Sequence, residues 1–314
     1  MFESHAKVFG IILLVGGAAA CGTGDDAGTT APATTPEAAK AEFWDAMWAG
    51  NVDAVPAARE HLLAALDAHP EDQEIARLAG RTYDLELSES QLGAHPVPFT
   101  DFRTYIQNEG KYLQHAIDVS TDPYAHALNV ANYSGVPYAL GALDNDSAKM
   151  ADAVAMMDEV KREYPALGLF ALGPKLMRAS KTSPDFAKAL EDMFAGYEVC
   201  AKTKIDRAHP DFVPVLHASF TERACMNLPT APHNIEGTAM MFADMLVKNA
   251  QPDAARPIYE AIKTVDSYST WRYRDRLEQR MAEDLAARAA KYDAGDPRSQ
   301  PSLGASPCLG CHQR

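Results

Sequence analysis

The chain has no excess of basic residues and no second long apolar run after its first twenty residues. Its 314 residues include 29 Lys and Arg against 43 Asp and Glu, which gives a formal net charge of −14 at pH 7. Without a basic stripe, such a chain is a poor candidate for binding nucleic acid. The acidic surface is better interpreted as solubilising. No downstream stretch approaches eighteen consecutive apolar residues, so the sequence predicts no membrane-spanning helix.

Familiar catalytic patterns are also missing. The sequence contains no Ser-His-Asp order, no Gly-rich phosphate loop, no zincin motif and no carboxylate pair that stands out from the acidic surface. Signals typical of β-strands are nearly absent. These absences favour a binding or carrier protein over an enzyme.

The first twenty residues have the pattern of a signal peptide. A short polar region with Lys7 precedes the apolar stretch from Val8 to Ala20, whose 13 residues would span about 20 Å as a helix, less than a hydrocarbon core of about 30 Å. The stretch GGAAAC, which ends at Cys21, resembles the lipobox of bacterial lipoproteins. This resemblance implies cleavage before Cys21 and lipidation of that cysteine. The alternative is ordinary secretion, in which Cys21 is removed.

Residues 22–40, GTGDDAGTTAPATTPEAAK, are rich in Gly, Thr, Ala and Pro and contain too few apolar residues to pack. This composition predicts a flexible tether. With residues 1–20 as signal peptide and 21–40 as lipidated cysteine and tether, we expect an exported protein that its lipid anchors at the periplasmic face of a bacterial membrane. Gly22 stands where lipoproteins of the inner membrane commonly have Asp, and the resemblance therefore favours the outer membrane.

Helical periodicity dominates residues 41–292. Apolar residues recur at steps of three and four in segments such as AREHLLAALDAHP and SAKMADAVAMMDEVKREYP, and Asp and Pro repeatedly open or close these segments. Each amphipathic helix would need neighbours on both sides. The sequence therefore predicts an all-α fold, an array of antiparallel helical hairpins.

Three segments of this region share similar offsets between their apolar residues. The offsets are carried by Ala58, Leu62, Ala65 and Pro70, by Ala153, Met157, Val160 and Pro165, and by Leu246, Ala255, Tyr259 and Ile262. The segments resemble tetratricopeptide repeats, although the Trp and Leu-Gly signatures of the first repeat helix are mostly missing. The resemblance implies a concave face that binds a partner protein or a solute. The alternative is a helical bundle without repeats.

The chain has five cysteines, and export implies an oxidising compartment. Cys21 goes to the lipid in the interpretation above, and Cys308 and Cys311 belong to a cluster at the carboxyl end. Cys200 and Cys225 remain, and we expect them to form a structural disulfide between neighbouring helical segments. The alternative is a pair of buried free thiols.

The last eight residues, PCLGCHQR, follow a Pro-, Gly- and Ser-rich linker over residues 293–306. The C-x-x-C-H spacing resembles the haem-attachment motif of c-type cytochromes, and its place near the carboxyl end resembles cytochromes c′. The resemblance implies one covalent haem c in a tail over residues 307–314. Cys308 and Cys311 would be the attachment points, and His312 would be the proximal iron ligand.

Other interpretations of this cluster are a dithiol redox motif, a zinc site and a local disulfide. For the distal position of the iron, the candidates are His233, Met226 or no protein ligand at all. The first functional hypothesis is electron transfer, or redox or ligand sensing, with a protein redox partner, and peroxidase activity is a weaker variant of it. The second hypothesis is a lipoprotein scaffold whose concave face binds a partner protein or a solute, with the terminal cysteines as a disulfide.

Overall fold

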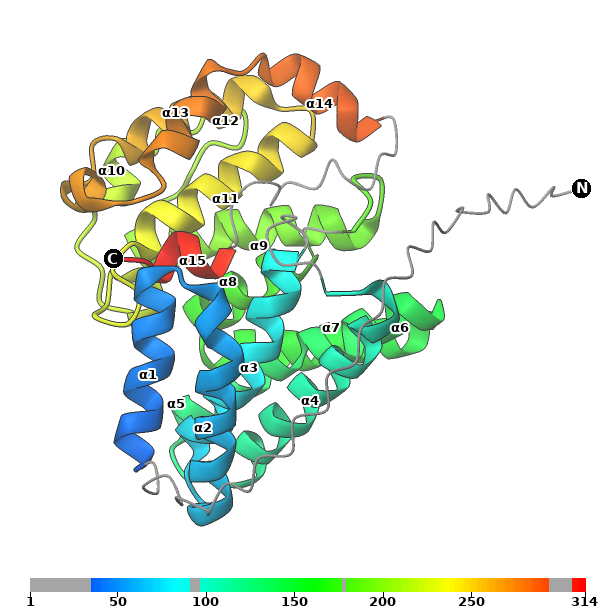
Figure 1. Ribbon diagram of the computed structural model, residues 1–314. Coiled ribbons are helices and arrows are strands. Elements are labelled where there is room, and N and C mark those ends of the chain that lie inside the picture. The colour runs from blue at the N-terminus through cyan, green and yellow to red at the C-terminus, as the bar shows by residue number, and fades with distance from the viewer. Residues whose placement is uncertain (1–34, 91–96, 177–178, 294–306) are drawn as a thin grey trace, which may run out of the picture. The chain divides into compact units, whose positions relative to one another are not determined.

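The structure is a computed structural model that describes residues 35–90, 97–176, 179–293 and 307–314 (Figure 1). Within these ranges the chain is helical, and its β structure is limited to an isolated bridge between Leu228 and Ala231. The predicted all-α class is confirmed. The predicted signal peptide and Cys21 lie outside the described residues. The first helix already begins at Pro36, inside the segment predicted as tether.

The first part of the fold contains four long helices and two short 3-10 turns. They are α1 (Pro36–Ala49), η1 (Val52–Ala54), α2 (Val55–Ala68), α3 (Gln73–Ser90), η2 (Phe99–Asp101) and α4 (Phe102–Asp118). Asp72 Oδ1 accepts the backbone N–H groups of Glu74 and Ile75, which satisfies free donors at the start of α3. Helix α1 ends at Gly50, whose φ of +64° lies in the left-handed region that glycine adopts without strain.

The middle part consists of α5 (Pro123–Tyr133), α6 (Gly135–Asp144), α7 (Ser147–Glu163), α8 (Pro165–Leu176) and α9 (Pro184–Ala201). Side-chain oxygens of Asp122, Asp146 and Ser183 cap α5, α7 and α9. Pro123 and Pro184 occupy first-turn positions, where a missing N–H costs nothing. Asp and Pro thus start helices as the sequence pattern indicates.

The last part contains α10 (Val213–Leu216), η3 (Arg223–Cys225), α11 (Asn234–Lys248), α12 (Pro252–Ile262), η4 (Asp266–Thr270), α13 (Arg274–Ala282), α14 (Leu285–Asp293) and α15 (Pro307–His312). Helix α11 is buried along nearly its whole length. A helix in this situation must be surrounded by other elements. Its neighbours are α9, α12, α14 and α15.

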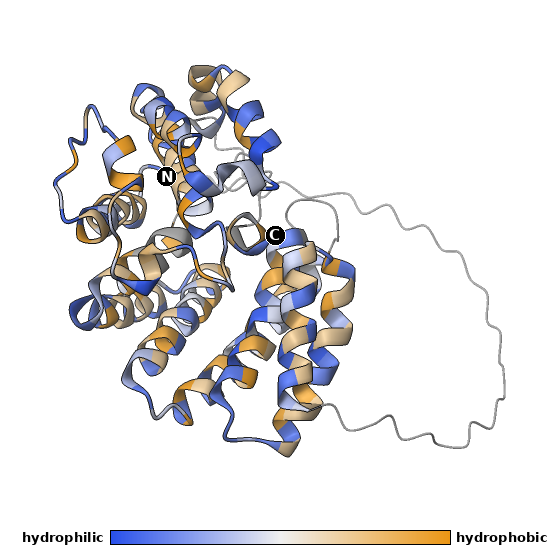
Figure 2. Ribbon diagram, turned by 90° about the vertical axis from the view of Figure 1, so that its left-hand side faces the viewer, coloured by the Kyte–Doolittle hydropathy of each residue, from blue (hydrophilic) through white to orange (hydrophobic). Residues whose placement is uncertain are grey.

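Helices that follow one another in the chain pack side by side, from α1 on α2 to α8 on α9, and again α11 on α12 and α12 on α13 (Figure 1). Helices separated by one other helix in the chain are also in contact, for example α1 with α3 and α5 with α7. Most helices have an apolar and a polar side (Figure 2). The apolar sides form a core that reaches from Phe43 in α1 to Tyr292 in α14. None of the helices in the described ranges is both long and apolar enough for a bilayer crossing.

A buried charge cluster joins four of the last helices. Asp244 of α11 is 3% exposed and accepts hydrogen bonds from the Tyr259 hydroxyl of α12 and from the Arg288 guanidinium of α14, the latter at 3.1 Å. Arg280 of α13 lies 3.5 Å from the same carboxylate. Burial by itself would lower the pKa of Arg288, but the Asp244 carboxylate raises it above its ordinary value. This carboxylate therefore fixes the angles at which α12, α13 and α14 meet α11.

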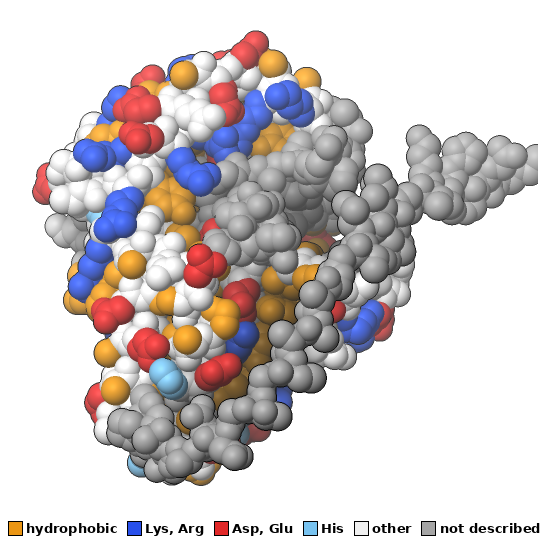
Figure 3. Space-filling model, viewed as in Figure 1, with side chains coloured by type: hydrophobic (Ala, Val, Ile, Leu, Met, Phe, Trp, Pro, Cys, Tyr) orange, Lys and Arg blue, Asp and Glu red, His pale blue; other side chains and the backbone are white. Residues whose placement is uncertain are grey.

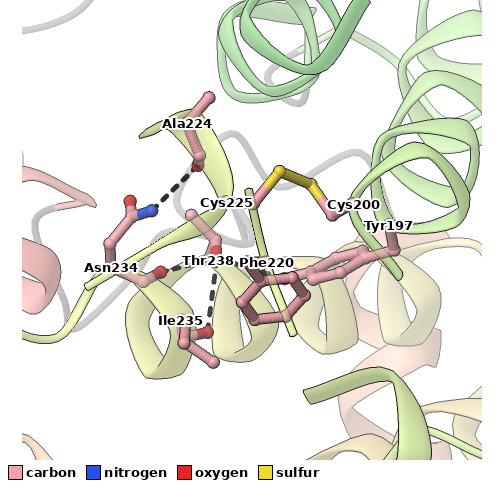
Figure 4. A pocket seen from close by; sticks show the side chains of 8 residues that line it. All are labelled: Tyr197, Cys200, Phe220, Ala224, Cys225, Asn234, Ile235 and Thr238. Atoms are coloured by element: carbon pink, nitrogen blue, oxygen red, sulfur yellow. Dashed lines mark hydrogen bonds between the residues drawn. A yellow bond between two sulfur atoms is a disulfide. The ribbon is translucent and has the colours of Figure 1, made fainter. Parts of the chain in front are cut away.

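Cys200 of α9 and Cys225 of η3 form the disulfide that the cysteine count leads us to expect, with Cα atoms 5.7 Å apart (Figure 4). Beside it, Tyr197 and Phe220 line a space of about 10 Å³, room for one water molecule. The space is too small for a ligand. The disulfide therefore serves to hold the loop before α11 against α9.

We predict that Asp244→Ala lowers the free energy of unfolding by about 3 kcal/mol, because it removes the main carboxylate partner of a buried guanidinium. Urea unfolding followed by circular dichroism measures the change. The control is Glu159→Ala, which removes one side of an exposed pair with Arg162 and should change the free energy by no more than about 0.5 kcal/mol. Equal effects of the two substitutions would contradict the role of Asp244.

Candidate functional site

The carboxyl-terminal segment, residues 307–314, packs between the first helix and the eleventh. Its one-turn helix α15 contacts α1, α3 and α11, and Figure 1 shows it (red) between α1 and α11. Leu309 is only 6% exposed and belongs to the main core, and Gly310 is also buried. The segment that the sequence marks as a tail is therefore part of the folded body.

Three backbone groups of the segment are hydrogen-bonded to the body. The Trp271 indole N–H donates to the Gly310 carbonyl at 2.8 Å. The His233 backbone N–H donates to the Cys311 carbonyl at 3.0 Å, and the Arg314 N–H donates to the Trp48 carbonyl at 3.0 Å. These bonds satisfy polar groups that burial would otherwise leave unpaired.

The side chains of the segment also have specific partners. His312 donates its Nδ1–H to the Thr230 carbonyl, which fixes the tautomer, and its ring centroid lies 5.6 Å from that of Trp44. Arg314 donates to the Pro229 carbonyl at 2.7 Å, and its guanidinium lies 3.5 Å from the centroid of the Trp48 ring, a cation–π contact. The segment thus presents an imidazole and a guanidinium to separate binding positions.

All three tryptophans of the chain touch these eight residues: Trp44 and Trp48 from α1, and Trp271 from the loop before α13. The tryptophan emission of the protein is therefore a direct reporter of whether the segment is in place.

Two glycines make the close approach possible. A Cβ atom at Gly237 would lie 2.5 Å from Cys311 Sγ and 3.0 Å from the Gly310 carbonyl carbon, closer than atoms pack. A Cβ atom at Gly50 would lie 2.2 Å from Gln313 Nε2. At Gly237 only a residue without a side chain lets α11 approach the segment this closely, whereas at Gly50 the end of the flexible Gln313 side chain can shift.

His233 lies beneath the segment as half of a buried acid–base pair. It is 3% exposed, and its Nδ1 lies 3.0 Å from Oε1 of the fully buried Glu236. Burial alone would raise the pKa of Glu236, but its hydrogen bonds from His233 and Ser267 lower it below the ordinary value, so that the carboxylate stays ionised. The pair anchors the first turn of α11 under the segment.

These contacts correct the haem prediction. Within the described ranges there is no group of three or more His, Cys, Asp and Glu side chains that could hold a metal ion. The His312 ring is bonded to Thr230 and lies against Trp44, and Cys311 Sγ fills the space beside Gly237.

The prediction of haem c as a cofactor is therefore wrong, and the roles that the motif implied for Cys308 and Cys311 as attachment points and for His312 as iron ligand depended on it. The side chain of Cys308 lies outside the described part of the chain. His233 lies next to the segment, and its Nδ1 is hydrogen-bonded to Glu236. The carbonyl of Met226 accepts a hydrogen bond from the Asn234 side chain and holds the turn before α11.

Several residues of the site are not marked by any sequence motif. Trp44, Trp48, Thr230 and Gly237 come from segments far apart in the chain, and only the fold assembles them. The small number of tryptophans is the one signal that could have pointed to them, because buried aromatic residues often anchor a contact. Comparison with protein-family models, with curated proteins and with solved structures finds no match.

The segment is expected to leave its place in mild acid. Part of the His312 surface is accessible, but its ring is closely surrounded by protein. This burial lowers the pKa of His312 from 6.5 to about 4, and the positive charges of Arg81 and Arg77 in α3 act in the same direction. Above pH 6.5 the imidazole is neutral in both states. Between pH 6.5 and 4 a released segment binds a proton that the docked one does not, so docking weakens as the pH falls.

We predict a reversible change of tryptophan emission between pH 6.5 and 4, with a docking equilibrium that falls on the order of 100-fold. His312→Gln, which cannot titrate, is the control for the carboxylates that protonate in the same range. The same pH dependence in this variant would rule out His312 as the cause.

Proposed function

We propose that this chain is an exported, lipid-anchored scaffold that binds a partner protein through its helical body. The export and anchor rest on the apolar stretch Val8–Ala20, on Cys21 in GGAAAC and on the tether-like residues 22–40. The electron-transfer hypothesis depended on haem c and falls with it. The scaffold hypothesis does not depend on a cofactor.

The repeat-like helices support this proposal. Ala58, Leu62 and Ala65 of α2, Ala153, Met157 and Val160 of α7, and the pair Ala255 and Tyr259 of α12 are all buried at similar offsets. Burial at recurring offsets is what stacked helical repeats with a shared core would require. We therefore treat the body as a tetratricopeptide-like array, an architecture that offers extended surfaces to other proteins.

The observation that carries the proposal is an apolar helix that the fold buries only in part. Helix α6, GVPYALGALD, is almost entirely apolar, but only Val136 and Gly141 are buried. Tyr138, Leu140 and Leu143 keep part of their surface accessible. Partly accessible apolar side chains on one helix are a candidate surface for binding another protein.

Neighbouring helices extend and frame this surface, which we call the α6 surface. Phe102 and Tyr105 of α4 and Tyr133 of α5 add partly buried rings to the same cluster as Leu140 and Leu143. At its edge, Asp144 pairs with Arg103 and with Lys149, the latter at 3.1 Å. An apolar centre with aromatic rings and a charged rim is the usual composition of a protein interface. Hydrophobic side chains are also visible over the region of α3 and α4 in Figure 3.

The anchor is tested with labelled palmitate. Cells that produce the full chain should yield a labelled protein in the membrane fraction, because the mature amino terminus would be the lipidated Cys21. Cys21→Ser should remove the label and release the protein from the membrane. Cys225→Ser serves as the control, since that sulfur belongs to the internal disulfide and its loss should leave the label unchanged. Unlabelled wild-type protein would contradict the anchor.

The α6 surface is tested by chemical cross-linking of the full chain in its own cell envelope. We predict that Leu140→Glu with Leu143→Glu reduces the yield of the cross-linked partner at least about 10-fold, the loss expected for about 1.4 kcal/mol. Val199→Glu is the matched control, because Val199 is an apolar residue of α9 with 37% exposure outside this surface. Variants must melt at similar temperatures. An equal loss in the control, or no loss in the double variant, would contradict the proposed surface.

A further inference from the structure

The groove that holds residues 309–314 has the properties of a peptide-binding site. We call it the tail groove and define it by Trp44, Trp48, Thr230, Gly237 and Trp271. Its walls come from α1, from the loop before α11, from α11 itself and from the loop before α13. The bound segment is six residues long and makes both backbone and side-chain contacts.

One set of contacts binds the backbone and would accept many sequences. The Trp271 indole N–H and the His233 backbone N–H each donate to a carbonyl of the segment, at 2.8 and 3.0 Å. The Trp48 carbonyl accepts a backbone N–H at 3.0 Å. Main-chain bonds of this kind supply affinity in peptide recognition, whereas side-chain pockets supply specificity.

A second set of contacts selects side chains at three positions. Leu309 enters the core, His312 places an N–H on the Thr230 carbonyl beside Trp44, and Arg314 lies over the Trp48 ring. An arginine on an aromatic face is typical of the residues that dominate binding energy, and the buried Leu309 adds apolar area to the contact. The spacing that these positions define is Leu-x-x-His-x-Arg.

The native segment leaves one donor of the groove unused. The indole N–H of Trp48 is buried and has no acceptor among the described residues. A segment that supplied an oxygen at this position would gain a hydrogen bond that residues 309–314 do not make. The groove is therefore occupied, but its hydrogen-bonding capacity is not fully used.

We propose that the tail groove binds a segment of a partner protein with the pattern Leu-x-x-His-x-Arg, and that residues 309–314 are a built-in competitor for it. This inference rests on the scaffold function proposed above and gives it a second site, with a defined partner chemistry and a means of regulation. A tethered competitor acts at an effective concentration on the order of millimolar. It keeps the groove closed to weakly fitting peptides and admits a segment that fits better.

The test uses the full chain with a weakened competitor. In His312→Ala with Arg314→Ala, the segment loses two of its three selective side chains, and the tryptophan emission should report its release. A fluorescein-labelled peptide, PSLGSHQR, should then bind the double variant at least about 10-fold more tightly than it binds the wild type. The peptide PSLGSAQA, without imidazole and guanidinium, should lose at least about 10-fold in affinity.

Two controls separate the groove from general effects. His209→Ala with Arg162→Ala removes the same residue types from positions that are 89% and 74% exposed, and this variant should bind the peptide no better than the wild type does. Adding Gly237→Ala to the weakened variant should lower the affinity, because the methyl group would lie 2.5 Å from the side-chain position of Cys311 and 3.0 Å from the backbone at Gly310.

Three results would overturn the proposal. They are unchanged tryptophan emission in the double variant, absence of peptide binding although the emission shows release, and equal binding by the double variant and the wild type. Circular dichroism establishes that the variants remain folded. The peptide assay needs neither the lipid anchor nor the α6 surface, so its failure would leave the scaffold proposal standing. Failure of the cross-linking test would likewise leave the groove standing.

Discussion

The contact between the carboxyl-terminal turn and Gly237 is the constraint on which the arrangement around the first and eleventh helices depends. Because no Cβ is present, Cys311 Sγ and the Gly310 backbone approach α11 closely enough for two hydrogen bonds, from His233 and from Trp271. The same approach brings Arg314 to the end of α1, over the Trp48 ring. A segment near the carboxyl end thus joins two helices that lie about two hundred residues apart in sequence, a contact whose loop-closure cost grows only slowly with chain length.

Helix α11 can occupy the centre of this arrangement because its buried polar residues all have partners. Glu236 in its first turn receives hydrogen bonds, and the amino end of a helix also favours an anion. Lys248 in its last turn donates to the Ala179 carbonyl at 2.7 Å, and burial lowers its pKa to about 8. Between them, Asp244 accepts a hydrogen bond from one tyrosine and forms ion pairs with two arginines. Each polar group offsets its own burial cost with a specific partner, and these partners determine which elements surround the helix.

The helical class, the buried faces and the pairing of Cys200 with Cys225 could be predicted from the sequence, because each depends on local periodicity or on a short count of alternatives. Leu62, Met157 and Tyr259 are buried as their spacing indicates. The position of the carboxyl-terminal segment could not be predicted in this way. It depends on Gly237 and on Trp48, which have no periodic relation to the segment and are brought to it only by the packing of whole helices. Local patterns predict the faces of helices, but the assembly of distant segments requires the tertiary fold.

The C-x-x-C-H spacing shows why a short motif predicts a capacity and not an occupied site. The spacing places two sulfurs and an imidazole within reach of one macrocycle, but a macrocycle also needs open space beside them. In this chain the Nδ1–H of His312 is directed to the Thr230 carbonyl, and Trp44 lies against the ring. The sulfur of Cys311 lies beside Gly237, close to where a Cβ atom of that residue would be. The same residues that would serve metal chemistry in an open setting therefore serve recognition here, because the imidazole donates a hydrogen bond and the neighbouring backbone is held on both sides.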